Sequence, residues 1–359
     1  MQALKRYESL HYDSISKEAP VDVFQKAGTD SKYKYVYAHV GSSGLGNRLL
    51  NIISSFVLAL ITDRVLVVYS PHYDLQKVFC EPFPNSSWIL PHEVKVPGGK
   101  MVDQYGLTLE TTDFKTLDTQ IIQMRDVEQY FMTQLFVNKH LIGRLNELFP
   151  GRNVGTVISK YLLHPVNEIW ADILHTFEHR DSNILTVGLQ VRHPAVSATA
   201  MLTCLPPLPQ TAHIFIASLG NLVQEVKNAY PTWNVTQRFV EGGERHDLTQ
   251  VKTALHDIFL LSMCDKVVIS VRSTFGYMIM ALKGSLCPIY GNSLHDSGVN
   301  KETCSWPNSH EICHHGGFAI MKQLNDSGAI NYNPNVPPAI YTGPCVDISS
   351  GIRLNTARD

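Results

Sequence analysis

The sequence lacks an excess of charge of either sign. Its 359 residues carry 30 Lys and Arg against 32 Asp and Glu, a formal net charge of -2 with neutral His, and no run of basic residues stands out. A nucleic-acid backbone or an anionic membrane surface attracts concentrated positive charge. The balance argues against either as the principal partner, and 44% hydrophobic against 17% charged residues excludes wholesale disorder.

The chain also lacks an uninterrupted apolar segment that reads as a membrane span. Its most apolar stretch, residues 52–68, is broken by Ser, Thr, Asp and Arg, so it predicts a buried helix followed by a strand. No signal peptide or anchor is visible. If the protein is luminal, we expect its targeting segment upstream of Met1 and a stem remnant or flexible lead-in over residues 1–32.

Familiar cofactor and metal motifs are missing. The glycine loop at residues 41–46 has neither the G-x-G-x-x-G spacing nor the Walker spacing, so a nicotinamide cofactor or ATP is not indicated. A strict D-x-D, the metal-diphosphate pair of one transferase architecture, is absent, and the nearest approach is Asp126-Val127-Glu128. We therefore predict no metal and no cofactor.

Cysteine is sparse, and with seven in the chain at least one lacks an internal partner. Several potential zinc ligands lie close together in the sequence: Cys304, His310, Cys313, His314 and His315. Their spacing fits no standard structural zinc pattern, and a Cys304–Cys313 disulfide in an oxidising compartment is the simpler expectation. The same compartment is consistent with three N-glycosylation triplets, at Asn85, Asn234 and Asn325.

What the chain does contain is an alternation of strands and helices. A strand, a small-residue loop, an apolar helix and a second strand follow one another over residues 33–69. A second series begins with a buried strand at 184–192 and includes a strand at 266–270 followed by a helix from Tyr277. The alternation predicts an α/β fold, and the length predicts two domains.

Three features at predicted strand ends favour an anionic ligand. The loop 41–48 precedes a helix, whose free amides and dipole attract anions. Arg192 follows a buried strand, where open α/β folds place ligands. Ser273 and Thr274 put hydroxyls at another helix start. Each also has a plain structural explanation, namely a tight glycine turn, a strand-end ion pair and a helix cap. Arg192 and the Ser273 turn follow separate strands of the same layer, so these two together predict a clamp for one diphosphate.

Glu128 is a weaker candidate. It follows the apolar Ile121-Ile122 and precedes Gln-Tyr-Phe, so it would project from a strand end or a helix start into a cleft. From spacing alone, an exposed glutamate in the first turn of a helix is the simpler interpretation.

Together these segments resemble the plant-type xyloglucan α-1,2-fucosyltransferase family. The resemblance is carried, in order from about Tyr35 to the region of Cys345, by G-L-G-N-R-L-L, T-D-R-V-L-V-V, V-F-C-E-P-F-P-N-S-S-W-I-L-P, M-R-D-V-E-Q-Y-F, Y-L-L-H-P-V-N-E-I-W, G-L-Q-V-R and S-V-R-S-T-F-G-Y. It implies a GT-B architecture, two Rossmann-like lobes facing a central cleft. The acceptor lobe would span 33–180, the GDP-fucose lobe 181–335, and a C-terminal segment over 336–359 would pack back on both.

The resemblance also implies an activity and its residues. The family is inverting and metal-independent, and would move fucose from GDP-fucose to a galactose hydroxyl, in α-1,2 linkage, on a cell-wall polysaccharide or glycoprotein glycan. Glu128 would be the general base and Arg192 would hold the β-phosphate. The nucleotide side would be lined by Arg272, Ser273, Thr274, Phe275 and Tyr277. The fucose or acceptor side would be lined by Gly46, Asn47 and Arg48.

The same resemblance implies partners and a location. The donor GDP-fucose is a substrate, so no cofactor is implied, and the acceptor is a galactose-containing glycan. We expect a Golgi-luminal type II membrane protein that contacts the membrane only through an anchor absent from this chain. A homodimer is one possible assembly.

Two alternatives remain. The chain could be a catalytically inactive glycan- or nucleotide-binding module, although Arg192 and the Ser-Thr-Phe turn argue against that. It could also be a GT-B transferase for another nucleotide sugar, because the sequence does not reveal the guanine contacts. The acceptor is also open, since His193-Pro194-Ala195 stands where plant members usually carry apolar residues.

Overall fold

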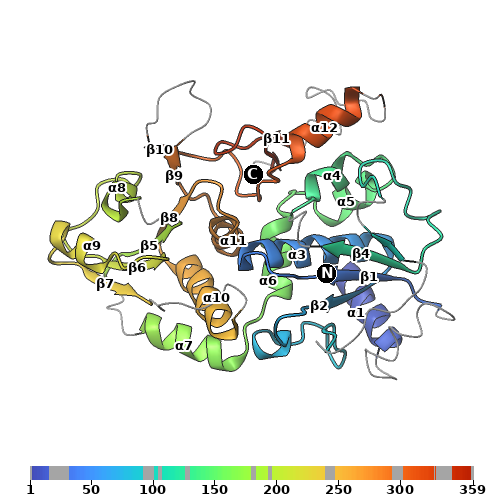
Figure 1. Ribbon diagram of the computed structural model, residues 1–359, viewed down its shortest axis with the longest axis horizontal. Helices are drawn as coiled ribbons and strands as arrows, with labels where there is room; N and C mark the ends of the chain where they lie inside the picture. Colours follow the sequence, from blue (N-terminus) through green and yellow to red (C-terminus); the bar gives the residue numbers. More distant parts are fainter. Residues whose placement is uncertain are drawn as a thin grey trace.

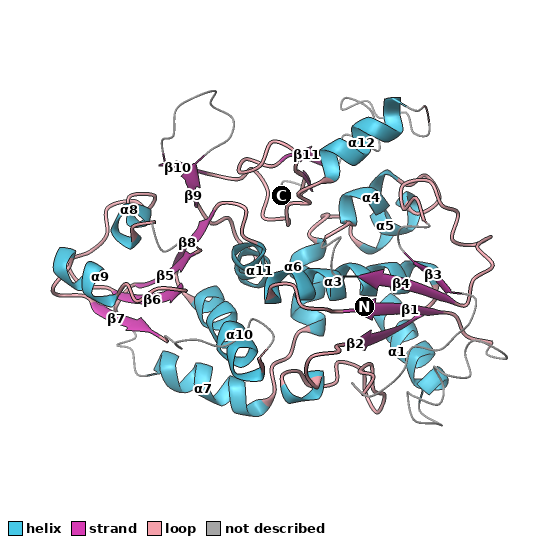
Figure 2. Ribbon diagram, viewed as in Figure 1, coloured by secondary structure: helices cyan, strands magenta, loops and turns pink. Residues whose placement is uncertain are grey.

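Two mainly parallel β-sheets form the framework of the computed structural model, shown in Figures 1 and 2. The structure describes residues 2–15, 32–91, 101–103, 107–125, 130–178, 183–192, 196–238, 247–292, 302–326, 328 and 342–356. The predicted alternation of strands and helices is confirmed in both halves of the described chain.

The first sheet has the order β2-β1-β4-β3, and its paired strands are all parallel. Its members are β1 (Tyr35–His39), β2 (Val65–Tyr69), β3 (Met101–Asp103) and β4 (Ile121–Arg125). The strands β1, β2 and β4 are buried along most of their length, as expected for a sheet covered on both faces.

The second sheet has the order β10-β9-β8-β5-β6-β7 and is parallel except for the β9–β10 pair. Its members are β5 (Thr186–Val191), β6 (His213–Ser218), β7 (Asn234–Gln237), β8 (Lys266–Ser270), β9 (Ile289–Asn292) and β10 (Glu302–Ser305). A separate hairpin pairs β11 (Thr342–Pro344) with β12 (Ile352–Leu354). β5 lies between β8 and β6, so ligand-binding loops after these three strands share one edge.

Helices connect and cover the two sheets. They are α1 (Gln2–Ile15), α3 (Leu45–Thr62), α4 (Met132–Val137), α5 (Ile142–Leu148), α6 (Val154–Leu162), α7 (Asn167–Glu178), α8 (Ala198–Leu202), α9 (Val223–Ala229), α10 (Leu248–Met263), α11 (Thr274–Lys283) and α12 (Gly317–Asp326), with a 3₁₀ turn at Leu75–Lys77. In Figure 1, α3, α6 and α11 lie between the two sheets, and these helices contact one another.

The helix α3 is the core of the junction between the sheets. By length and composition alone it could cross a membrane, but 89% of the window that passes this test is buried inside the protein. Its polar residues Arg48, Asn51, Ser54 and Ser55 are buried along with the apolar ones, so the whole helix belongs to the core. The predicted buried helix at the start of residues 52–68 is therefore confirmed.

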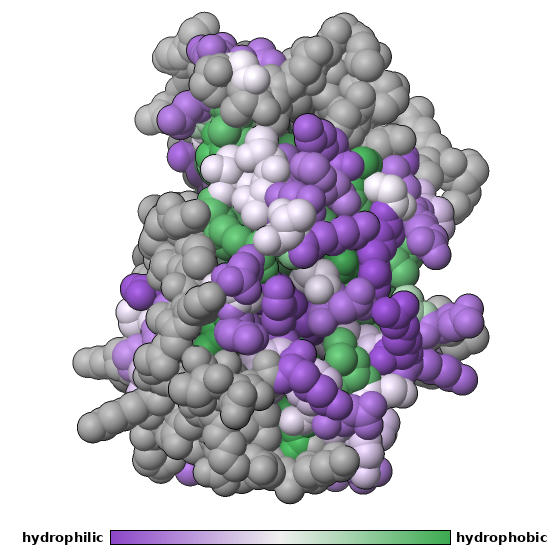
Figure 3. Space-filling view, turned by 90° about the vertical axis from the view of Figure 1, so that its right-hand side faces the viewer, coloured by the Kyte–Doolittle hydropathy of each residue, from purple (hydrophilic) through white to green (hydrophobic). Residues whose placement is uncertain are grey.

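The outer face of the first lobe in Figure 3 mixes hydrophilic residues with small apolar areas.

The N-terminal residues differ from the expected loose lead-in, because Gln2–Ile15 form the helix α1. Tyr7 and His11 lie on its buried face, where the Tyr7 hydroxyl accepts from the Leu66 amide at 2.8 Å and His11 Nε2 lies 3.0 Å from the Leu66 carbonyl oxygen. The buried face combines these two side chains with Ile15, so the helix has few of the strongly apolar residues by which a buried helix is recognised in sequence.

The expected Cys304–Cys313 disulfide is wrong, although both cysteines are bonded. Cys204 pairs with Cys304, and Cys313 pairs with Cys345. Cys304 lies on β10, the edge strand of the second sheet, whereas Cys313 lies against the C-terminal hairpin, so nearness in sequence does not place them together. In the described part of the chain, Cys313, Cys345 and Asp347 gather within 4.8 Å as potential metal ligands. The disulfide occupies two of these three groups.

Candidate functional site

The helices α3 and α11 begin against each other. A Cβ atom added at Gly46 would lie 2.6 Å from both the Phe275 nitrogen and the Thr274 carbonyl carbon. The Thr274 hydroxyl also donates to Asn47 Oδ1 at 2.5 Å. The glycine loop and the Ser-Thr-Phe turn, predicted separately as anion sites, are thus brought together. Both helices present the positive end of their dipole at this point.

Local sequence explains why each helix begins there. Ser273 caps α11 by accepting from the Gly276 amide at 3.3 Å. Gly44 caps α3 with no side-chain hydrogen bond, which leaves the first amides of α3 unserved by a cap. Side chains larger than hydrogen at residue 46 would force the two helices apart.

Arg192 lies beside the same turn. Its amide donates to the Ser270 hydroxyl at 3.0 Å at the end of β8, and its guanidinium donates through Nη1 to the Arg272 carbonyl. The Arg192 side chain is exposed. A cation at the end of β5 and the amides at the start of α11 therefore share the carboxyl edge of the second sheet.

Arg272 is held in an uncommon backbone conformation, with φ of 51°. Its amide donates to Asp347 Oδ2 at 2.9 Å, and its Nε donates to the Asp347 carbonyl at 3.4 Å. The Tyr277 hydroxyl also donates to Asp347 Oδ2. Tyr277 is fully buried, so its hydroxyl supports this carboxylate from inside the protein, whereas the resemblance implies a nucleotide contact.

Arg48 likewise lies inside the fold and not on an open face. Only 1% of it is exposed. Its Nε donates to the Ser43 carbonyl at 2.6 Å, and its Nη1 donates to the Tyr73 hydroxyl at 3.1 Å. These hydrogen bonds hold the glycine loop from the side of the protein interior. The cleft-facing position that the resemblance implies for Arg48 differs from this arrangement.

Glu128 lies outside the described residues. The strand before it, β4, ends at Arg125, which pairs in register with His39 at the end of β1. A strand therefore ends three residues before Glu128, and the catalytic role of Glu128 stays a prediction.

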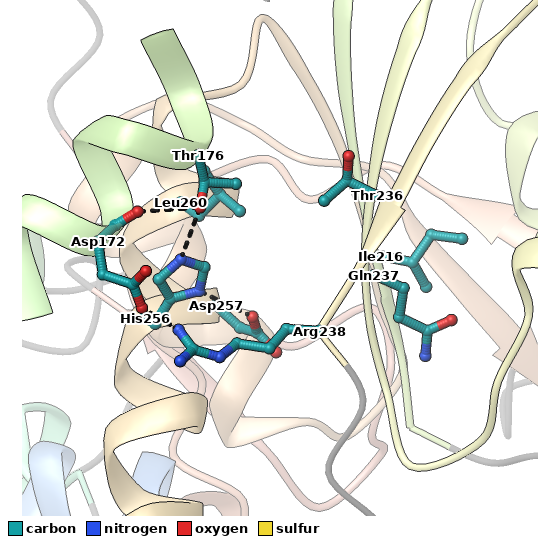
Figure 4. Close-up of a pocket in the computed structure, with 9 residues that line it drawn as sticks. All are labelled: Asp172, Thr176, Ile216, Thr236, Gln237, Arg238, His256, Asp257 and Leu260. Carbon is teal, nitrogen blue, oxygen red and sulfur yellow. Dashed lines mark hydrogen bonds and ion pairs between the residues drawn. The ribbon is translucent and has the colours of Figure 1, made fainter. Parts of the chain in front are cut away.

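A cavity of about 270 Å³ lies between α7, α10 and the strands β6 and β7 (Figure 4). It is lined by Asp172, Thr176, Ile216, Thr236, Gln237, Arg238, His256, Asp257 and Leu260. Arg238 forms an ion pair with Asp172, and His256 Nδ1 lies 3.2 Å from Asp257 Oδ1. Burial raises the pKa of Asp257, and the contact with His256 opposes that rise.

Asp257 and Asp347 were not among the site residues predicted from sequence. Asp257 follows His256 and directly precedes the apolar run Ile258–Leu261 of α10, and a carboxylate at such a position is a usable signal of a ligand or an ion pair. Asp347 lies two residues after Cys345 in a Gly- and Ser-rich segment. Only the folded chain brings it to Arg272.

Comparison with known proteins places these features in context. The sequence model for the xyloglucan fucosyltransferase family matches residues 21–127 and 231–319. A galactoside 2-alpha-L-fucosyltransferase of Pisum sativum is 26% identical over 436 residues, covering 98% of this chain and 75% of the relative. The galactoside 2-alpha-L-fucosyltransferase of Arabidopsis thaliana is 27% identical over 436 residues, covering 98% of this chain and 76% of the relative.

Solved structures share the fold. A mutant of Arabidopsis thaliana FUT1 in complex with GDP superposes with a TM-score of 0.75 at 24% identity, covering 98% of this chain and 91% of that one. Fucosyltransferase NodZ from Bradyrhizobium reaches a TM-score of 0.52 at 15% identity, covering 77% of this chain and 99% of that one. The predicted GT-B class with two Rossmann-like lobes is confirmed.

Proposed function

The chain belongs to the xyloglucan fucosyltransferase family and is a GDP-fucose-dependent fucosyltransferase, and we propose that it forms an α-1,2 linkage to galactose with inversion at fucose C1 and without a metal. The observation that carries the proposal is the meeting of the α3 and α11 N-termini at Gly46, beside Arg192. Two helix N-termini and a guanidinium at one place suit a diphosphate.

The chemistry follows from where charge develops. An acceptor hydroxyl attacks fucose C1 opposite GDP, and the breaking bond places negative charge on the diphosphate. Arg192 and the first amides of α11 are fixed before the reaction, so they stabilise this charge without reorganising. Such a donor contributes about 3 to 4 kcal/mol in comparable sites. This stabilisation by Arg192 and the α11 amides takes the place of the charge neutralisation that a metal ion would supply.

We assign the nucleoside end of the donor to the cavity beneath α7. Ile216 and Gln237 lie near the carboxyl ends of β6 and β7, and β6 is next to β5, which carries Arg192. Guanine presents two neighbouring N–H donors, which pair with a carboxylate. Asp257 supplies a carboxylate in this cavity. Asp257→Asn would set an amide donor against those donors, so GDP affinity should fall while folding is retained.

Glu128 is proposed as the general base on the family match alone. Its carboxylate would take the acceptor proton late in the displacement, or orient the hydroxyl while water carries the proton away. The acceptor is a galactose-containing glycan of a cell-wall polysaccharide or a glycoprotein. Two disulfides support an oxidising lumen, and we propose the Golgi and a type II membrane topology.

Product analysis with a blocked acceptor tests the function. Purified protein is incubated with GDP-fucose and either a galactose-terminated glycan or the same glycan methylated at galactose O2. The proposal predicts an α-1,2 product from the first, seen by NMR, and none from the second. GDP-mannose and UDP-galactose serve as donor controls. A fucose at another hydroxyl contradicts the linkage, and loss of activity with EDTA that Mn²⁺ or Mg²⁺ restores contradicts the metal-free mechanism.

A further inference from the structure

The C-terminal segment 342–356 inserts a buried carboxylate beneath the candidate diphosphate site. The disulfide Cys313–Cys345 and the backbone pairing of His314 with Ile352 attach this segment to the rest of the fold. Asp347, between these two attachments, is 1% exposed. Its environment therefore depends entirely on its protein contacts.

The carboxylate and the carbonyl of Asp347 have cationic or hydrogen-bond donor neighbours. Oδ2 accepts from the Arg272 amide at 2.9 Å and from the Tyr277 hydroxyl, while the Asp347 carbonyl accepts from Arg272 Nε at 3.4 Å. Oδ1 lies 3.5 Å from Arg353 Nη2, and both of these side chains are fully buried. A buried ion pair is costly to desolvate, so its stabilising value alone is a weak reason for its presence.

The contacts determine the shape of the turn after β8. Arg272 has φ of 51°, which is uncommon for a residue other than glycine and is retained where surrounding contacts impose it. Asp347 holds this residue at two points, the amide and Nε. The Arg272 carbonyl then faces Arg192, whose guanidinium donates to it.

We propose that Asp347 is a positioning residue for fucosyl transfer, which orients Arg192 through Arg272. The C-terminal segment then contributes to the donor site, in addition to being attached to the rest of the fold. The inference rests on the proposed role of Arg192 at the diphosphate.

A purely structural role makes a different prediction. If the Asp347–Arg353 pair only attaches the segment, its loss lowers stability without acting through Arg192. Glu311 offers a matched control, because it is equally buried and accepts from the Tyr130 hydroxyl at 2.5 Å and the Gly155 amide at 2.7 Å. Among the described residues, the hydrogen bonds of its carboxylate involve neither Arg272 nor Arg192, although its carbonyl accepts from Arg353 Nη1 at 3.5 Å.

The experiment is a double-mutant cycle. Asp347→Asn, the pair Asp347→Asn with Arg353→Gln, and Glu311→Gln are each made alone and with Arg192→Lys. The pair removes both buried charges, so it leaves no uncompensated ion if Asp347→Asn alone fails to fold. For each variant kcat, KM for GDP-fucose, GDP affinity and the melting temperature are measured.

The positioning role predicts that both Asp347 variants lower kcat at least tenfold, and less than twofold further once Arg192 is already Lys. Glu311→Gln should shift the melting temperature by a similar amount, and its effect on kcat should multiply with that of Arg192→Lys. Wild-type kcat in a folded Asp347 variant, or losses that multiply with Arg192→Lys, would overturn the proposal. A wild type that binds GDP but transfers no fucose would instead contradict the proposed function, and GDP affinities in the same cycle would still test the coupling.

Discussion

Thr274 donates its hydroxyl hydrogen to Asn47 Oδ1 at 2.5 Å, although the two residues are 227 positions apart. The contact joins the start of α11 in the second lobe to the start of α3 in the first. Because both helices direct free amides and positive dipole ends to this place, an anion bound here would interact with both lobes.

Gly46→Ala should abolish most transfer, because the new Cβ would lie 2.6 Å from backbone atoms of Thr274 and Phe275. Alanine is favoured over glycine within a helix by about 1 kcal/mol, so any loss would come from the lobe contact and not from helix propensity. Gly44→Ala is the matched control, since nothing lies within 4 Å of its added Cβ. Equal kcat in the two variants would argue against a tight junction.

Asn47→Asp should weaken GDP binding about tenfold or more while the melting temperature is kept. Aspartate has nearly the same shape and can still accept from Thr274, but it adds a negative charge where the diphosphate is proposed to lie. The same charge suits a helix N-terminus, so the fold should tolerate it. Calorimetric titration with GDP measures the effect. Unchanged affinity would place the diphosphate elsewhere.

Much of this site was predictable from sequence. The glycine loop, Arg192 and the Ser273 turn were expected at strand ends because apolar strands, small residues and helix starts follow one another there. The meeting of Gly46 with Thr274 was not predictable, because it depends on how two lobes pack. A short motif within one lobe carries no information on how the two lobes pack.

Other features had weak or misleading local signals. Asp347 reaches Arg272 only through a segment that the Cys313–Cys345 disulfide attaches. Spacing favoured the nearer Cys304 as the partner of Cys313, but β10 carries Cys304 toward Cys204 instead. In α1, Tyr7 and His11 share the buried face with Ser14 and Ile15, so few strongly apolar residues marked the helix in sequence.

The buried Glu311 should make stability depend on pH in a defined direction. Burial raises its pKa from 4.5 to about 7, against the opposing hydrogen bond from Tyr130. Between these values the folded state keeps a proton that the unfolded state has lost, so the free energy of unfolding falls as pH rises. Denaturant titrations from pH 4.5 to 7 should show this fall relative to Glu311→Gln. Parallel curves for the two proteins would contradict a raised pKa of Glu311.

Glu128→Gln separates proton removal from positioning. If Glu128 is the base, the variant should bind GDP like the wild type yet lose most transfer, since glutamine keeps the shape and hydrogen bonding of glutamate without its basicity. If Glu128 only orients the acceptor, Gln should retain substantial transfer while Glu128→Ala fails. Wild-type kinetics in both variants would remove Glu128 from the mechanism.

The most direct test of the central claim is the turnover of Arg192→Ala with GDP-fucose and a galactose-terminated acceptor. We predict a fall in kcat of about a hundredfold or more with the melting temperature unchanged, because the lost interaction strengthens as charge develops on the leaving diphosphate. Arg192→Lys should recover only part of it, since a point charge does not reproduce a two-pronged contact. Near-wild-type turnover in a folded Arg192→Ala protein would contradict a diphosphate site at this edge of the second sheet.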